Sequence, residues 1–376
     1  MTGATVRTDV AVVGAGPWGL ATAWQLATRG LGVRLIDDRR PPAAGVAAGM
    51  LAPLSEARAG EETLFALMRA SAGEWPAFAA SLAAASGGDP GHRPCGAFTV
   101  AARPEHVGRV RETMATLERL DVRTEWVPGS RLRQREPGLG TAVAGGLDLP
   151  GEHRVEPPLL MDALRAACLR TGVRIVPAAA TGLMRDGAGR VTGVVTGRDG
   201  AVEAGHVVLA VGWSAGRLAP RVPVRPVKGQ ILRLAARPGA PCPVTRIVRT
   251  PAVYLVPRDG GTLTVGASVE EAGDRAITAG VVHELLDEAL RAVPEVREMR
   301  LTDLAAGLRP VTPDGRPAIG RDPADGLVWA VGGARHGLLL TPLASRLAAD
   351  AVMGGPADPR VDPARFPVRE EVLQCT

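Results

Sequence analysis

A glycine-rich turn near the N-terminus has the residue types and spacing that hold a dinucleotide. Gly14, Gly16 and Gly19 form the pattern Gly-x-Gly-x-x-Gly. The first glycine allows a tight turn, the second lets the backbone approach a pyrophosphate, and the third lets a helix pack on a strand. Asp37 lies roughly 20 residues further on, where a carboxylate accepts hydrogen bonds from ribose hydroxyls. Asp38 is the neighbouring candidate, but Asp37 directly follows the second strand, so we predict Asp37 as the ribose ligand.

The cysteines and histidines do not predict a metal site or a nucleophile. The four cysteines, Cys95, Cys168, Cys242 and Cys375, contain no CxxC pair, and their spacing fits no zinc site. The histidines lack metal-ligand spacing, and no Ser/His/Asp or Cys/His arrangement is evident. We therefore expect no bound metal, and free thiols in a reducing cytoplasm.

The elements that position the glycine turn can be read from the apolar runs around it. Residues 10–13 form the continuous apolar run of a strand buried in a parallel sheet. A helix then ends at Gly30, and residues 33–36 predict the second strand. The C-terminal end has the same pattern, with a strand over 327–331, Gly332-Gly333, and a helix over 341–352. A nucleotide-binding sheet can therefore be assembled from both ends of the chain.

The rest of the chain predicts a second, β-rich layer. At 376 residues the chain is too long for one ordinary core. A hairpin is expected around residues 258–261, between two strand patterns. Further helices are expected over 61–85, 106–120, 159–171 and 281–293, and further strands over 95–101, 124–127, 173–176, 191–195 and 202–211. The pattern favours a mixed α/β fold of two units.

Charge and hydropathy argue against nucleic-acid binding and against a membrane-spanning segment. The formal net charge is +5, but Lys228 is the single lysine and the arginines form no block. With one tyrosine and four phenylalanines, the chain also offers little to stack on single-stranded bases. No run of about 18 apolar residues predicts a membrane span. A strand pattern begins at Asp9, so we expect no signal peptide.

A series of short motifs runs in order along nearly the whole chain. It begins at Ala48-Gly49-Met50-Leu51-Ala52-Pro53, followed by Glu56. It continues through Arg93-Pro94-Cys95-Gly96, Glu136-Pro137-Gly138-Leu139, Val155-Glu156-Pro157, Pro226-Val227-Lys228-Gly229-Gln230, Val253-Tyr254-Leu255-Val256-Pro257-Arg258, Ala306-Gly307-Leu308-Arg309-Pro310-Val311-Thr312-Pro313-Asp314, and Arg335-x-Gly337-Leu338-Leu339-Leu340-Thr341-Pro342. These motifs resemble those of glycine oxidases, which belong to the D-amino-acid oxidase family. Such an ordered match is far more specific than the glycine pattern alone.

The resemblance implies a flavoprotein of two domains that binds FAD noncovalently. Its Rossmann-like FAD-binding domain would comprise residues 1–90, 145–222 and 302–362. A substrate domain on a mainly antiparallel sheet would comprise 91–144 and 223–301, leaving 363–376 as a tail. By the same resemblance, Tyr254, Arg309 and Arg335 would bind the substrate carboxylate, which suits their donors. The FAD would also contact two segments, Ala48-Gly49-Met50 and Gly337-Leu338-Leu339.

The implied reaction is oxidation of the carbon–nitrogen bond next to a carboxylate. The substrate would be glycine or another small or N-substituted amino acid. Hydride would pass to the flavin, the imine would hydrolyse to a keto acid or aldehyde, and oxygen would become hydrogen peroxide. A dehydrogenase with another electron acceptor, a tailoring oxidase of a larger secondary amine, and a flavoprotein without turnover remain as alternatives. The resemblance leaves a homo-oligomer open.

The chain departs from the family pattern at two places. The Gly-Ala-Ser step that usually precedes the Ala-Gly-Met segment is missing, so one side-chain contact to the FAD phosphates is lost. The late motif usually reads Gly-His-aromatic-Arg-Asn-Gly, but here Gly333 and Ala334 replace the histidine and the aromatic residue, and His336 is new. If these positions line the pocket, the lost ring volume would admit a larger substrate. We expect His336 to be a local hydrogen-bonding residue, and the sequence assigns no role to Lys228.

Overall fold

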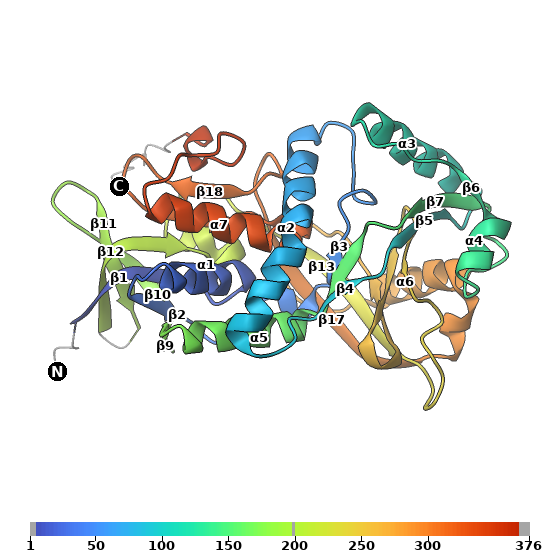
Figure 1. Cartoon of the computed structure of the whole chain (residues 1–376), viewed down its shortest axis with the longest axis horizontal. Helices are drawn as coiled ribbons and strands as arrows, with labels where there is room; N and C mark the ends of the chain where they lie inside the picture. Colours follow the sequence, from blue (N-terminus) through green and yellow to red (C-terminus); the bar gives the residue numbers. More distant parts are fainter. Residues whose placement is uncertain (1–4, 198–199, 368–376) are drawn as a thin grey trace, which may run out of the picture.

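The computed structural model describes residues 5–197 and 200–367, which form two sheet-based layers joined by a long helix. Figure 1 shows a sheet with its helices at one end of the long axis, a second sheet at the other end, and helix α2 (Glu62–Ser86) between them. No helix in these ranges is both long and apolar enough to cross a membrane. The mixed α/β fold expected from the sequence is confirmed.

The first sheet, sheet A, is built around parallel strands in the order β9–β2–β1–β12–β19. Strand β12 is long, so β11 pairs antiparallel with its first half while β19 pairs with its end. The strands of sheet A are β1 (Thr5–Val13), β2 (Val33–Ile36), β9 (Arg174–Val176), β10 (Ala180–Arg185), β11 (Val191–Thr196), β12 (Gly200–Leu209), β18 (Ala318–Arg321) and β19 (Val328–Val331). Both ends of the chain thus contribute to one sheet, as the apolar runs predicted.

One face of sheet A is covered by four helices. These are α1 (Pro17–Thr28), α2, α5 (Pro157–Arg170) and α7 (Thr341–Val352), which pack on one another and share a core with Val10, Val12 and Leu35. Ala11, Val13 and Ile36 point to the opposite face, where they pack with Trp329 and strands β11 and β12. Strands β1 and β2 are therefore buried on both faces, which explains their continuous apolar sequence.

The second sheet, sheet C, has the order β17–β13–β16–β15–β14–β5–β7–β6. Most neighbouring strands are antiparallel, with β14 and β5 the parallel exception. Its strands are β5 (Ala97–Ala101), β6 (Val127–Pro128), β7 (Gly145–Leu149), β13 (Arg225–Ala235), β14 (Ile247–Arg249), β15 (Tyr254–Arg258), β16 (Thr262–Gly266) and β17 (Arg300–Val311). The predicted hairpin at 258–261 joins β15 to β16.

Helix α6 (Ala279–Ala292) covers the outer face of sheet C. Its Leu285 and Ala289 pack on Leu232 and Leu234 of β13. The remaining helices are α3 (His106–Arg119) and α4 (Gly129–Arg135), and a small sheet of β3 (Met50–Leu51), β8 (His153–Val155) and β4 (His92–Pro94) lies between the layers. Short 3-10 helices complete the chain: η1 (Ala43–Val46), η2 (Gly212–Arg217), η3 (Asp259–Gly261), η4 (Pro294–Glu298), η5 (Ala334–His336) and η6 (Pro363–Arg365).

Sheet membership divides the chain at other points than the expected domain boundaries. Strand β7, at 145–149, and most of β17, at 300–311, were expected in the first domain, yet both pair within sheet C. A division into domains therefore remains a prediction, with these two strands assigned to the second layer.

Candidate functional site

A cavity of about 1040 Å³ runs between the strand ends of sheet A and the inner face of sheet C. Every residue that the sequence analysis assigned to a site lines it, except Gly19. They are Gly14, Gly16, Asp37, Ala48, Gly49, Met50, Tyr254, Arg309, Arg335, Gly337, Leu338 and Leu339. Segments more than 300 residues apart in sequence therefore meet in one place.

The three glycines of the N-terminal turn are constrained in three different ways. Gly14 has φ +102°, and a Cβ there would lie 2.5 Å from the carbonyl oxygen of Ala210. A Cβ at Gly19 would lie 1.8 Å from the carbonyl oxygen of Gly14, so this residue lets α1 pack against the turn. A Cβ at Gly16 would meet no atom within 4 Å, because this residue faces open space in the cavity. Together they leave bare backbone at the N-terminus of α1, which suits an anionic ligand.

Asp37 is nearly buried and firmly held. Its Oδ2 accepts from the guanidinium of Arg165 at 2.9 Å, and its Oδ1 accepts from the backbone N–H of Arg39 at 2.9 Å. Asp38 also lines the cavity and pairs with Arg40 at 3.3 Å. Both carboxylates remain able to accept from a ligand, so the preference for Asp37 stays a prediction.

The two segments expected to contact the cofactor are fixed by close backbone packing and by a hydrogen bond from a side chain. Gly49 has φ +84°, and a Cβ there would lie 2.0 Å from the carbonyl oxygen of Val155. The carbonyl of Gly337 accepts from the indole of Trp18 at 2.7 Å, which ties the late motif to the start of α1. Gly337, Leu338 and Leu339 lie directly before α7, as the sequence predicted.

Tyr254 and Arg309 lie on the inner face of sheet C, and two glycines make room for them. A Cβ at Gly229 would lie 2.2 Å from Nη2 of Arg309, and one at Gly266 would lie 2.6 Å from the hydroxyl of Tyr254. Arg309 donates to the carbonyl oxygens of Lys228 and Ser268 at 3.1 and 3.0 Å. Burial raises the pKa of Tyr254, although the charge of Arg309 opposes this, so the phenol is a donor at neutral pH.

Arg335, the third predicted carboxylate ligand, is engaged by carboxylates of the protein itself. Its Nε donates to Oε2 of Glu56 at 2.9 Å, and its Nη2 donates to Oε2 of Glu61 at 2.5 Å. The other oxygen of Glu56 accepts from Arg249. Burial works to raise the pKa of Glu56, but the charges of Arg249, Arg335 and their neighbours lower it to about 2. Glu56 is thus an anion that bridges two guanidinium groups at the substrate end of the cavity.

Glu56, Glu61, Arg249 and Arg58 are site residues that the sequence analysis did not assign. Arg249 stands directly opposite Tyr254 in the pair of strands β14 and β15, so both side chains project from the same face. Recognition of these short strands as a hairpin would have identified Arg249. The partnership of Glu56 with Arg335 spans most of the chain, and no local pattern predicts it.

The two replacements within the late motif, Gly333 and Ala334, differ in their effect. A Cβ at Gly333 would lie 2.9 Å from the indole of Trp18, so that ring already fills the space that the missing side chain would leave. The expectation of vacated volume is therefore wrong at Gly333. Ala334 does line the cavity and has φ +43°. His336 is buried, and burial together with Arg335 lowers its pKa to about 3, so it is a neutral imidazole.

Lys228 belongs to a cluster of charged side chains that is separate from the cavity. Its side chain is 3% exposed and pairs with Asp274 at 2.9 Å and with Glu270 at 3.4 Å. Its neighbours Val227 and Gly229 line the cavity, and Lys228 does not, because strand residues alternate between faces. Lys228 therefore anchors the loop that follows β16.

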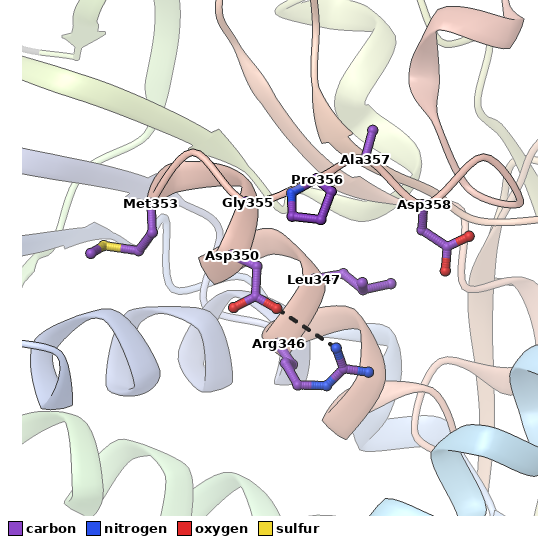
Figure 2. A pocket seen from close by; sticks show the side chains of 8 residues that line it. All are labelled: Arg346, Leu347, Asp350, Met353, Gly355, Pro356, Ala357 and Asp358. Atoms are coloured by element: carbon purple, nitrogen blue, oxygen red, sulfur yellow. Dashed lines mark ion pairs between the residues drawn. The ribbon is translucent and has the colours of Figure 1, made fainter.

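A second, smaller hollow of about 360 Å³ lies at the end of α7 (Figure 2). Its charged groups already have partners: Arg346 pairs with Glu74 and Asp350, and Asp358 pairs with Arg360. Within the described residues, no group of three or more His, Cys, Asp or Glu side chains is placed to hold a metal ion. The large cavity is therefore the candidate site.

Comparisons with known proteins cover nearly the whole chain. The family described as "FAD dependent oxidoreductase" matches residues 9–351. The bifunctional protein ThiO/ThiG of Synechocystis sp. is 33% identical over 378 residues, which cover 98% of this chain and 56% of that protein. The chain thus spans little more than half the length of this relative.

Relatives of similar length include glycine oxidases. The glycine oxidase of Geobacillus kaustophilus is 33% identical over 360 residues, which cover 93% of each chain. A crystal structure of glycine oxidase from Geobacillus kaustophilus superposes with a TM-score of 0.87 at 30% identity, covering 98% of this chain and 100% of that one. The glycine oxidase structure from Bacillus cereus gives a TM-score of 0.85 at 25% identity, covering 94% and 99%.

Proposed function

The chain belongs to the family of FAD-dependent oxidoreductases, and on that premise we propose that it oxidises the carbon–nitrogen bond next to a carboxylate in a small or N-substituted amino acid. The observation that carries the proposal is the arrangement of Arg309 and Tyr254. A guanidinium held over Gly229 and a phenol held over Gly266 form a paired donor site inside the cavity that begins at the glycine turn. Such a pair suits a planar carboxylate.

The residues at the other end of the cavity fit FAD. The bare backbone of Gly14 and Gly16 would hold the pyrophosphate, and Asp37 would hold the ribose. The segments at 48–50 and 337–339 would contact the rest of the cofactor. When bound there, FAD supplies the acceptor for the hydride that leaves the α-carbon.

The side chains at the substrate end orient and desolvate the amine. Arg309 and Tyr254 fix the carboxylate, and a fixed carboxylate limits the directions available to the α-C–H bond. The amine must lose its proton before it can release hydride. Burial and the neighbouring guanidinium charges lower its pKa, so no protein base is needed. The imidazole of His336 is buried and neutral, which is consistent with surroundings that lower the pKa of the amine.

Oxygen is the proposed electron acceptor. In that reaction the amine, oxygen and water give a keto acid or aldehyde, ammonia or a smaller amine, and hydrogen peroxide. Relatives called glycine oxidases support this choice, as does the similar fold. We propose a cytoplasmic location for the reaction, and the free thiols of Cys95, Cys168 and Cys242 support it.

A coupled assay tests the proposal on the FAD-bound protein. Glycine, N-alkyl glycines and an amine without a carboxylate are supplied, and peroxide and carbonyl product are measured. We expect equal amounts of both products from the carboxylates and little from the plain amine. Product without peroxide, but with reduction of an added dye, would replace the oxidase by a dehydrogenase. No product with any amine and either acceptor would identify a flavoprotein without turnover.

A further inference from the structure

Four arginines line the substrate end of the cavity, and two of them are neutralised by the protein. They are Arg58, Arg249, Arg309 and Arg335. Glu56 pairs with both Arg249 and Arg335, and Glu61 pairs with Arg335. Three donors of Arg335 point at these two carboxylates, so this residue has few left for a ligand.

The other two arginines have no carboxylate partner within the described residues. Arg309 donates to two backbone carbonyl oxygens. Arg58 makes no hydrogen bond and no ion pair within residues 5–197 and 200–367, and it is an exposed residue that lines the cavity. Partial burial of its guanidinium and the repulsion of Arg335 lower the pKa of Arg58, while Glu56 and Glu61 oppose this, which places Arg58 among the charges of this cluster.

The charges at this end of the cavity leave two positive charges unmatched. Four guanidinium groups face the two carboxylates of Glu56 and Glu61, while Tyr254 and His336 are neutral. One substrate carboxylate on Arg309 and Tyr254 matches one of these charges. Arg58 then remains as an exposed cation that lines the same cavity.

We propose that the substrate carries a second carboxylate and that Arg58 binds it. The substrate class is an amine with two carboxylates, such as an N-(carboxyalkyl)glycine. One carboxylate lies on Arg309 and Tyr254, and the other reaches Arg58. This inference rests on the proposed function and narrows its substrate class.

Other cavity arginines are weaker candidates for this role. Arg225 pairs with Glu271, Arg40 pairs with Asp38, and Arg217 stacks on the ring of Trp213 at 5.1 Å. Arg275 is exposed on the loop after β16 and is not among the charges that act on Glu56. Arg275 is therefore a matched control, because it is an exposed arginine on the same cavity.

The test compares two substrates of equal shape and different charge. N-(2-carboxyethyl)glycine and N-isopentylglycine have side arms of the same size, but only the first arm is an anion. We expect kcat/KM to favour the diacid about fivefold to tenfold in the unmodified enzyme, with the preference falling as salt is added. Arg58→Gln should reduce the ratio to near one, whereas Arg275→Gln should leave it unchanged.

A binding measurement makes the result independent of turnover. Diglycolate and methoxyacetate are non-oxidisable ligands with two carboxylates and one carboxylate, respectively. If diglycolate binds more tightly than methoxyacetate, and Arg58→Gln removes this difference while Arg275→Gln does not, the second-carboxylate proposal is supported. This holds even if no amine is oxidised, and in that case only the proposed function fails. Oxidation of glycine and N-isopentylglycine without any preference for the diacid overturns the second carboxylate and leaves the oxidase intact. A preference that persists in Arg58→Gln overturns Arg58 as its binding residue.

Discussion

Replacement of Glu56 by glutamine removes the carboxylate that joins Arg249 to Arg335. In the folded protein the pKa of Glu56 is lowered from 4.5 to about 2. A shift of about 2.5 units corresponds to about 3 kcal/mol of stabilisation of the native state. Because the pKa of Glu56 is lowered in the folded protein, this stabilisation is fully present above pH 4.5 and is lost as the pH falls through about 2. At neutral pH, the Glu56→Gln variant should therefore lose most of this stabilisation.

This free energy converts into a measurable melting temperature. For 376 residues the entropy of unfolding is about 0.8 kcal/mol per kelvin, so about 3 kcal/mol lowers Tm by about 4 °C. The assay is thermal unfolding of the FAD-bound protein at neutral pH, followed by circular dichroism. Glu61→Gln is the control, because Glu61 is 31% exposed and, among the residues that the structure describes, pairs only with Arg335. Its loss should cost less than about 1 kcal/mol, or about 1 °C. Equal melting temperatures for Glu56→Gln and the control would refute the bridging role.

Three further changes test other parts of the site. Arg309→Lys should lower kcat/KM by about 2–4 kcal/mol, because a point charge does not replace a planar fork, and steady-state kinetics on glycine and N-alkyl glycines measure this loss. Asp37→Ala should weaken FAD binding by about 1–3 kcal/mol, measured by fluorescence titration, and acid precipitation should release the flavin from the unmodified protein. Burial raises the pKa of Glu152 to about 7, so the unmodified protein loses about 3 kcal/mol of stability as the pH rises from 4.5 to 7. Denaturant unfolding of Glu152→Gln across this range should show a flatter pH dependence, and an unchanged slope would refute the raised pKa of Glu152.

Elements with strong local patterns were predictable from the sequence. The helix expected over 341–352 is α7, and the one expected over 61–85 is α2, displaced by one residue. The hairpin at 258–261 was predicted because its turn residues lie between two short apolar strand patterns. In contrast, the strand expected over 124–127 is limited to the two residues of β6. The long strand β17 was not expected, because its charged and glycine residues obscure the alternation that pairing with β13 requires.

The candidate site was predictable only as a set of positions. The glycine turn, Tyr254 and Arg309 belong to motifs, and all of them except Gly19 reach the cavity. The surroundings that decide their chemistry are long-range contacts: Glu56 meets Arg335 across most of the chain. No local pattern shows that Arg335 is engaged by carboxylates of the protein. The same holds for Trp18, whose ring fills the space beside Gly333.

The most direct test of the proposed activity is an anaerobic titration of the FAD-bound protein with an N-alkyl glycine and its decarboxylated analogue. The flavin absorbance in the visible region reports reduction without any assumption about the electron acceptor. We predict that the N-alkyl glycine bleaches the flavin, that admission of oxygen restores the colour with release of peroxide, and that the decarboxylated amine bleaches it far more slowly. Equal bleaching by both amines, or none with either, would contradict oxidation directed by a carboxylate on Arg309 and Tyr254.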